Sequence, residues 1–128
     1  MTNINTQQAL ILFAHGARAA SWAAPFERLR ELTQARVPEV PVSLAFLELM
    51  EPRLPERVAE LAAQGVTALT VVPVFLGQGG HLLRDLPLLV EQLRIDHPRL
   101  AIKVAGAVGE DAGVLDAMTR YCVSAIDA

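Results

Sequence analysis

The sequence predicts an α/β domain, a three-layer α/β/α sandwich built around a four-stranded parallel sheet. Four compact apolar runs alternate with segments of helical periodicity along the chain. The runs are apolar with little interruption, which is typical of parallel strands that helices cover on both faces. Alternating strands and helices joined by right-handed crossovers fold into a doubly wound sandwich. For a chain of 128 residues we expect a single domain, residues 1–128.

The predicted strands span residues 9–14, 42–47, 68–76 and 100–106. Each is rich in aliphatic side chains over a length usual for a strand. Pro73 lies inside the third run and lacks the N–H that a central strand donates to its neighbour. We therefore expect an irregularity at Pro73.

The predicted helices span residues 21–37, 52–65, 82–98 and 111–126. The first places its large apolar residues near one face: Trp22, Phe26, Leu29, Leu32 and Val37. Gly65 suits the end of the second helix, and Pro87 fits the first turn or a local kink of the third. We expect His97 at the surface, in the turn that follows the third helix. Cys122 fits the apolar face of the last helix, so we expect it in the core.

Composition excludes several classes of protein. Apolar residues make up 52% and charged residues 20% of the chain, which is ordinary for a globular domain. The formal net charge of -3 argues against broad nucleic-acid binding, which needs a basic face. Cys122 is the lone cysteine, no basic residue precedes the short apolar run at the N-terminus, and no run approaches the roughly 20 residues that span a bilayer. We therefore expect a cytoplasmic protein without membrane or nucleic-acid partners.

Three side chains with useful chemistry follow the predicted strands. His15 comes directly after the first strand, Glu48 ends the second and His81 follows the third. Ligands of open parallel sheets bind beyond the carboxyl ends of the strands, so we expect these residues to converge on one rim. Two imidazoles and a carboxylate suit cobalt, nickel, iron or zinc better than magnesium. They also suit proton transfer near neutral pH.

Each of these residues also has a purely structural interpretation. A histidine beside glycine, such as His15, often only hydrogen-bonds the backbone of its loop. Glu48 alone fits a helix cap or a salt bridge. Function is favoured for His81, because Gly79 and Gly80 beside it let a ligand approach the backbone closely.

Three segments taken together resemble the sirohydrochlorin cobaltochelatase (CbiX) family in its small single-domain form: LFAHGAR, LAFLELMEPRLPE and VVPVFLGQGGHLLRDLP. The likeness runs in order from Leu10 to Gly106. This family belongs to the class II, ATP-independent tetrapyrrole chelatases. The resemblance implies a chelatase-like half-unit that inserts a divalent metal, foremost Co²⁺, into sirohydrochlorin or a related tetrapyrrole of cobalamin biosynthesis, with loss of two protons.

The resemblance also assigns roles to the rim residues. His15 and His81 match the two active-site histidines that bind the metal and accept pyrrole protons. Glu48 matches a carboxylate that assists metal delivery or proton removal. The metal is a substrate, and no prosthetic group is implied. Longer members of the family carry two half-units that face each other, so the resemblance implies a homodimer for this chain.

A wide, flat macrocycle needs room and counter-charges. The glycines of the loop GQGGH remove side chains that would block its approach: Gly77, Gly79 and Gly80. Three arginines stand just past the rim positions and suit the carboxylates of sirohydrochlorin: Arg18, Arg53 and Arg84. The alternative for each arginine is an ordinary solvated surface charge. The helix N-termini expected after His15 and His81 would add N–H donors for these carboxylates.

Other functions remain open on the sequence. Two histidines and a glutamate do not select sharply among cobalt, nickel and iron. A tetrapyrrole or metal carrier that binds without turnover would carry the same residues. A small phosphate-handling domain rests only on the glycine loop, which has neither the spacing nor the lysine of a Walker motif.

Overall fold

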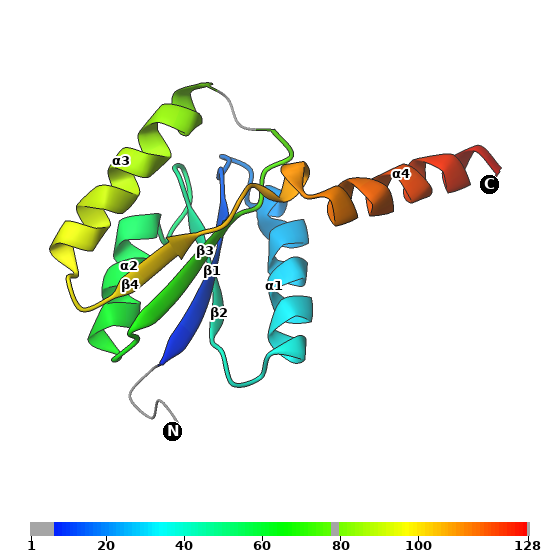
Figure 1. The fold of residues 1–128 in the computed structure, drawn as a ribbon. Coiled ribbons are helices and arrows are strands. Elements are labelled where there is room, and N and C mark those ends of the chain that lie inside the picture. Colours follow the sequence, from blue (N-terminus) through cyan, green and yellow to red (C-terminus); the bar gives the residue numbers. More distant parts are fainter. Residues whose placement is uncertain (1–6, 78–79, 128) are drawn as a thin grey trace.

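The structure, a computed structural model, describes residues 7–77 and 80–127. It contains a four-stranded sheet in the order β2-β1-β3-β4, in which every neighbouring pair is parallel (Figure 1). The strands are β1 (Gln8–Ala14), β2 (Val42–Phe46), β3 (Ala68–Pro73) and β4 (Ala101–Val104). The predicted α/β class and parallel sheet are confirmed.

The irregularity expected at Pro73 proves to be the end of strand β3. Pro73 is the last residue of β3, where it pairs with Phe13 and is fully buried. The next residue, Val74, donates its N–H to the Phe13 carbonyl over 2.9 Å. The apolar run continues to Leu76, but as a loop over the carboxyl end of the sheet.

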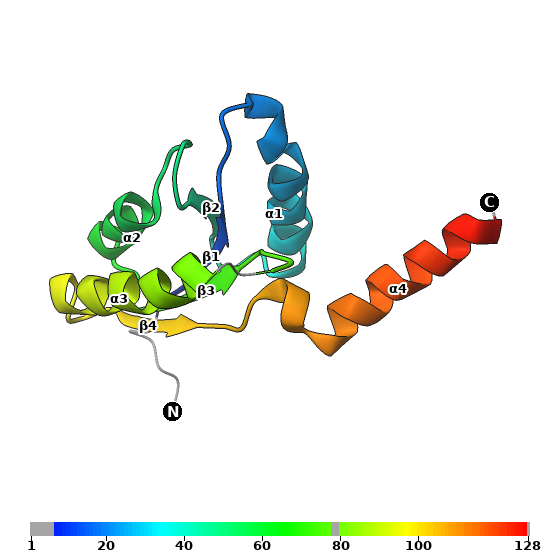
Figure 2. The ribbon, with the colours of Figure 1, turned by 90° about the horizontal axis from the view of Figure 1, so that it is seen from above.

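The helices lie on both sides of the sheet. They are the 3₁₀ turn η1 (Ala20–Ala23), α1 (Ala24–Arg36), α2 (Leu54–Ala63), α3 (Gly80–Asp96), the 3₁₀ turn η2 (Val108–Glu110) and α4 (Ala112–Asp127). Figure 2 shows α1 on one side of the sheet and α2 and α3 on the other. The larger core cluster joins the sheet to α2 and α3, with Ile11, Val58 and Val90 among its buried members. A smaller cluster around Phe46 joins the sheet to η1 and α1.

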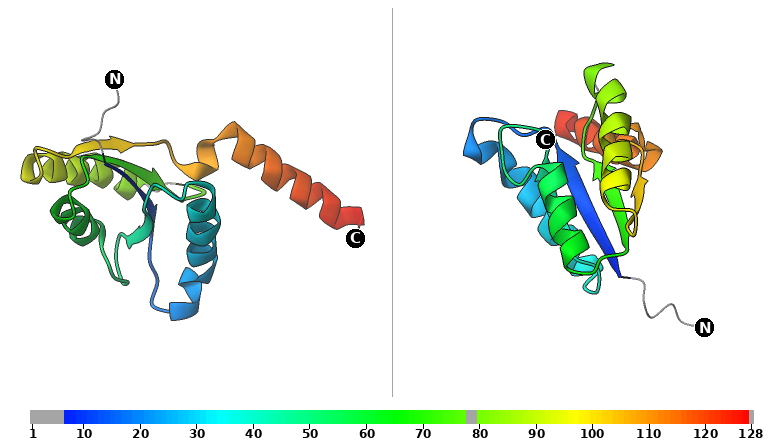
Figure 3. Two further views of the ribbon diagram at one scale, coloured as in Figure 1. Left: turned by 90° about the horizontal axis from the view of Figure 1, so that it is seen from below. Right: turned by 90° about the vertical axis from the view of Figure 1, so that its left-hand side faces the viewer.

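One expectation about the later helices is wrong and another is narrowed. Of the two places expected for Pro87, the first turn is excluded, because α3 begins earlier, at Gly80, and Pro87 lies in its interior. Cys122 is exposed and not in the core, because α4 points away from the sheet (Figures 1 and 3). His97 lies half-buried in the turn after α3. No helix in the described part of the chain is long and apolar enough to cross a membrane.

Candidate active site

The carboxyl ends of β1 and β2 bring two of the predicted site residues together. His15 follows Ala14, the last residue of β1, and its side chain is exposed. Its imidazole lies against the ring of Phe75, with ring centroids 4.4 Å apart. Phe75 is buried and supports one side of the imidazole, while the His15 residue as a whole stays exposed.

Glu48 lies in the loop that leaves β2, directly beside His15. The Glu48 N–H donates to the His15 carbonyl over 3.1 Å, and the Leu47 N–H donates to the Ala14 carbonyl over 2.9 Å. These bonds continue the β1–β2 ladder past the end of the strands and hold the two loops together. The Glu48 side chain itself is exposed at the rim.

Gly16 makes this close approach possible. Its φ is +91°, a conformation that favours glycine, and a Cβ at this position would overlap the Glu48 carbonyl oxygen. The site therefore requires glycine directly after His15. Sequence reasoning used the neighbouring glycines of the third loop but missed this one, although it stands in the segment FAHGAR.

The third loop is tied to the chain segment after β4. The Gly109 N–H donates to the Phe75 carbonyl over 2.8 Å, and a Cβ on Gly109 would overlap the Leu76 carbonyl. Gly77 faces open space, since an added Cβ would meet no atom within 4 Å. Gly77 thus leaves this part of the rim free.

The remaining residues of this loop are only partly described. Gly79 lies outside the described residues. Gly80 begins α3 and His81 belongs to its first turn, whereas the sequence analysis expects both in the loop before the helix; the His81 side chain is outside the description. Among the described side chains no group of three metal-binding residues is present. His15 and Glu48 are therefore the described pair on which the site can be built.

The three arginines are exposed around the rim. Arg18 follows the His15 loop, Arg53 directly precedes α2, and Arg84 lies on α3. The backbone N–H of Arg53 donates to the Glu56 carboxylate over 2.9 Å, which caps α2. None of the three guanidinium groups forms an ion pair with another described side chain. They are available to an anionic ligand.

No helix begins directly after His15, since η1 starts at Ala20 and α1 at Ala24, so the donors expected from a helix N-terminus there are absent.

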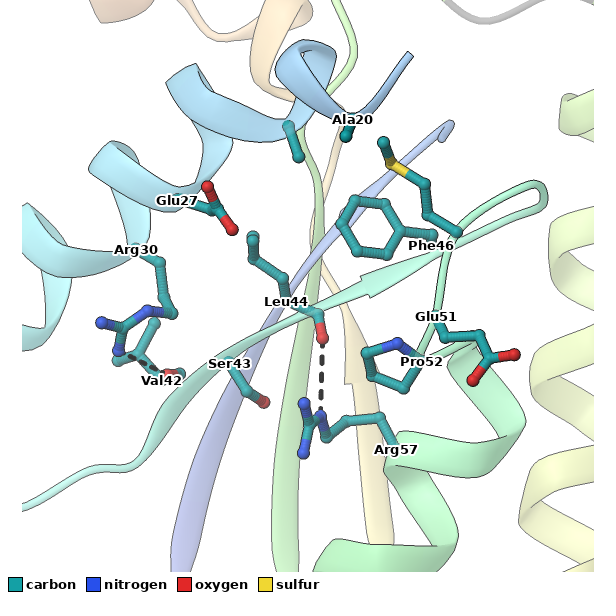
Figure 4. Close-up of a pocket in the computed structure, with 12 residues that line it drawn as sticks. Ala20, Glu27, Arg30, Val42, Ser43, Leu44, Phe46, Glu51, Pro52 and Arg57 are labelled. Carbon is teal, nitrogen blue, oxygen red and sulfur yellow. Dashed lines mark hydrogen bonds between the residues drawn. The ribbon is translucent and has the colours of Figure 1, made fainter. Parts of the chain in front are cut away.

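A separate hollow of about 590 Å³ lies at the outer edge of β2 (Figure 4). The Arg30 guanidinium donates to the Val42 carbonyl over 3.3 Å, and that of Arg57 to the Leu44 carbonyl over 3.4 Å. These contacts occupy carbonyls that an edge strand would otherwise expose. The hollow includes neither His15 nor Glu48, and we interpret its arginines as protection of the sheet edge.

The chain is thus a parallel α/β domain in which an imidazole and a carboxylate lie just beyond the carboxyl ends of the adjacent strands β1 and β2. The chain belongs to the CbiX family, whose model matches residues 9–124. The chain is 37% identical to the sirohydrochlorin cobaltochelatase of Methanopyrus kandleri, over 62% of this chain and 55% of that protein. It is 26% identical to that of Sulfolobus acidocaldarius, over 91% of both chains.

Solved structures share the fold over nearly the whole chain. A CbiX protein of Marinobacter aquaeolei VT8 superposes with a TM-score of 0.83 and 33% identity, over 94% of this chain and 98% of that one. The sirohydrochlorin chelatase SirB of Bacillus subtilis subspecies spizizenii, solved in complex with cobalt, gives 0.79 and 25% identity over 93% of this chain. This chain covers 51% of SirB, so its length corresponds to half of that chelatase.

Proposed function

We propose that this protein inserts a divalent metal, foremost Co²⁺, into sirohydrochlorin or a closely related tetrapyrrole without ATP. The observation that carries the proposal is the pairing of His15 and Glu48 at the rim, in a chain of the CbiX family. The relatives named as sirohydrochlorin cobaltochelatases support the same activity. A ferrochelatase of Bacillus subtilis, 28% identical over 88% of this chain, makes iron the second candidate metal.

Metal insertion requires the protein to bind the metal ion and to accept protons from the macrocycle. Metal insertion replaces two pyrrole N–H protons by one M²⁺ ion, so two protons must leave the macrocycle for each ion that enters. A neutral imidazole offers a lone pair to a metal or to a proton, and we assign these roles to His15 and His81. Glu48, next to His15, accepts a proton or guides the incoming cation. The exposed position of both described residues fits a substrate too wide to enter a closed pocket.

The macrocycle would lie over the rim with its carboxylates near Arg18, Arg53 and Arg84. Each guanidinium is exposed and suits a carboxylate as a bidentate partner. We assign Gly77, Gly79 and Gly80 the role of leaving room for the flat face of the ring, since glycine has no side chain. Because SirB is twice as long, we propose that two copies of this chain form a homodimer that supplies the second half of the site.

We place the protein in the cytoplasm. Cys122 is the lone cysteine and its thiol is exposed, which suits a reducing compartment. No nucleic-acid or membrane partner is proposed.

An anaerobic spectroscopic assay tests the function. Catalytic amounts of protein are mixed with sirohydrochlorin and Co²⁺, Ni²⁺ or Fe²⁺, and the spontaneous rate is subtracted. We expect many turnovers, and a loss of about 100-fold or more in the rate for His15→Ala and for Glu48→Gln, since each removes a group that binds metal or accepts a proton.

His97→Ala is the matched control, because His97 lies in the turn after α3, beyond the amino end of the sheet. It should keep the wild-type rate. A product yield that stops at one equivalent per site would show a carrier and refute the enzyme. Equal losses in His97→Ala and His15→Ala would refute the assignment of the site.

A further inference from the structure

Two large apolar side chains lie exposed at the rim of the candidate site. Leu49, in the loop after β2, is 57% exposed, and Leu76, in the loop after β3, is 66% exposed. In the described ranges, residues 7–77 and 80–127, the other exposed large hydrophobic side chains all belong to α1, α3 or α4. The two loop leucines are thus separate from the helix surfaces and follow strands that end at the candidate site.

The backbone of Leu49 has a conformation that leucine seldom adopts. Its φ is +68°, and in the described part of the chain Leu49 is the one residue other than glycine with a positive φ. This left-handed conformation is unfavourable for a residue with a Cβ, and Asn or Gly adopts it more readily. Strained residues that their surroundings hold in place are typical of functional sites.

Hydrogen bonds on both sides of Leu49 hold its loop in this shape. Before it, the Glu48 N–H donates to the His15 carbonyl over 3.1 Å. After it, the Pro52 carbonyl accepts the Phe46 N–H over 2.9 Å, so the loop closes on the end of β2. These bonds hold an exposed apolar residue directly beside Glu48.

The loop that carries Leu76 is also held in place. The Gly109 N–H donates to the Phe75 carbonyl over 2.8 Å, and a Cβ on Gly109 would overlap the Leu76 carbonyl. Phe75, directly before Leu76, lies against the His15 imidazole with ring centroids 4.4 Å apart. Each leucine therefore follows a residue that contacts His15.

The order of the strands places the His15 loop between the two leucine loops. In the order β2-β1-β3, β1 lies in the middle, and all three strands are parallel, so their loops leave the sheet at one rim (Figure 1). Neighbouring strands are about 4.8 Å apart, so the loops after β2 and β3 emerge about 10 Å apart. This separation is comparable with the width of a tetrapyrrole ring.

We propose that Leu49 and Leu76 form an apolar seat, on which one face of the macrocycle rests with its centre over His15. The faces of a conjugated tetrapyrrole are apolar, whereas its carboxylates lie at the periphery. Leucines beneath the ring and arginines around it then recognise different parts of one ligand. This inference rests on the function proposed above and adds two residues that select a flat apolar face.

The test is binding of metal-free sirohydrochlorin to the full chain, followed by quenching of tryptophan fluorescence. Trp22 is the lone tryptophan and packs, half-buried, in the cluster around Phe46 together with Met50, the residue after Leu49. We expect Leu49→Asn and Leu76→Asn each to raise Kd about tenfold, since each removes apolar surface that the ring covers. The increase should be the same at low and high salt, because no charge is lost.

Substitutions of Leu49 separate the apolar contact from the backbone strain. Leu49→Met keeps an apolar side chain of similar volume and should bind the macrocycle like the wild type. Leu49→Asn relieves the backbone, because Asn accepts a positive φ, so its Tm should rise by about 2 °C while binding weakens. A residue that only supports the fold would not combine a gain of stability with a loss of affinity.

Ile95→Asn is the matched control, since Ile95 is 67% exposed but lies in the last turn of α3, at the amino end of the sheet. It should leave Kd unchanged. If the wild type binds sirohydrochlorin and inserts metal while Leu49→Asn and Leu76→Asn bind equally well, the apolar seat is refuted and the function is kept. A wild type that does not bind the macrocycle refutes the function itself.

Sedimentation velocity of the same variants checks the other use of exposed leucines, a contact between two copies of the chain. We expect Leu49→Asn and Leu76→Asn to keep the wild-type sedimentation coefficient. A variant that dissociates but keeps its affinity for sirohydrochlorin would overturn the proposal.

Discussion

At the scale of single residues, position relative to the strands explains the candidate site. His15 and Glu48 are far apart in sequence, yet both follow parallel neighbours in the sheet, and their backbones join at 3.1 Å. The sequence predicts this convergence because the carboxyl ends of parallel strands share one rim. It did not predict Phe75 as the support of the His15 ring, because that contact depends on how the third loop folds back over β1.

The rim arginines lead to a prediction about substrate affinity. Arg53 is exposed and forms no ion pair with a described side chain, so its charge is free to meet a macrocycle carboxylate. We expect Arg53→Gln to raise KM for sirohydrochlorin several-fold with little change in kcat, since such a contact binds ground and transition states alike. The measurement is steady-state kinetics at two salt concentrations.

Arg99→Gln serves as the control, because Arg99 is exposed between α3 and β4, away from the rim. An unchanged KM for Arg53→Gln, or an equal change for both variants, would show that Arg53 is an ordinary surface charge.

At the scale of the elements, loop contacts determine where the strands present their side chains. The strands β1 and β2 are continued by hydrogen bonds from Leu47 and Glu48, so their loops leave the sheet as a pair. Two glycines allow the loops to approach each other closely. Gly16 contacts the Glu48 carbonyl and Gly109 contacts the Leu76 carbonyl, and a side chain at either glycine would clash. Neither requirement is readable from the sequence, because a glycine that avoids a clash looks the same as one that merely ends an element.

Gly16 and Gly65 provide a matched pair for testing this. Both have a positive φ, +91° and +93°, but an added Cβ meets the Glu48 carbonyl only at Gly16 and nothing within 4 Å at Gly65. We expect Gly65→Ala to lower the free energy of unfolding by about 1 kcal/mol, the cost of the backbone conformation. Gly16→Ala should cost about 2 kcal/mol or more and also reduce metal insertion, because the His15 and Glu48 loops must separate.

Urea unfolding and the insertion assay on both variants measure these effects. Similar losses of stability and activity in the two variants would contradict the role assigned to Gly16.

At the scale of the whole molecule, the main feature is helix α4, whose apolar residues are left exposed by the other described elements. The sequence correctly predicts a last helix with an apolar face, but it does not tell which surface covers that face. The expectation that Cys122 is buried assumed that the chain covers its own sheet, and the outward direction of α4 makes it wrong for the single chain.

If two copies form the homodimer proposed above, stability depends on protein concentration. Unfolding of a dimer into two chains is favoured by dilution, so we expect the wild-type Tm to rise by about 3 °C for each tenfold increase in concentration. Differential scanning calorimetry over a hundredfold range measures this, and a concentration-independent wild-type Tm would contradict the dimer.

The sequence by itself determined the α/β class, the four strands, the four helices and the family of this protein. These features follow from local periodicity and from motifs that are contiguous along the chain. The tertiary structure decided the direction of α4, the need for Gly16 and Gly109, and the contact of His15 with Phe75. Each of these depends on the distance between segments remote in sequence, and that distance exists only once the loops after β1, β2, β3 and β4 have packed against one another.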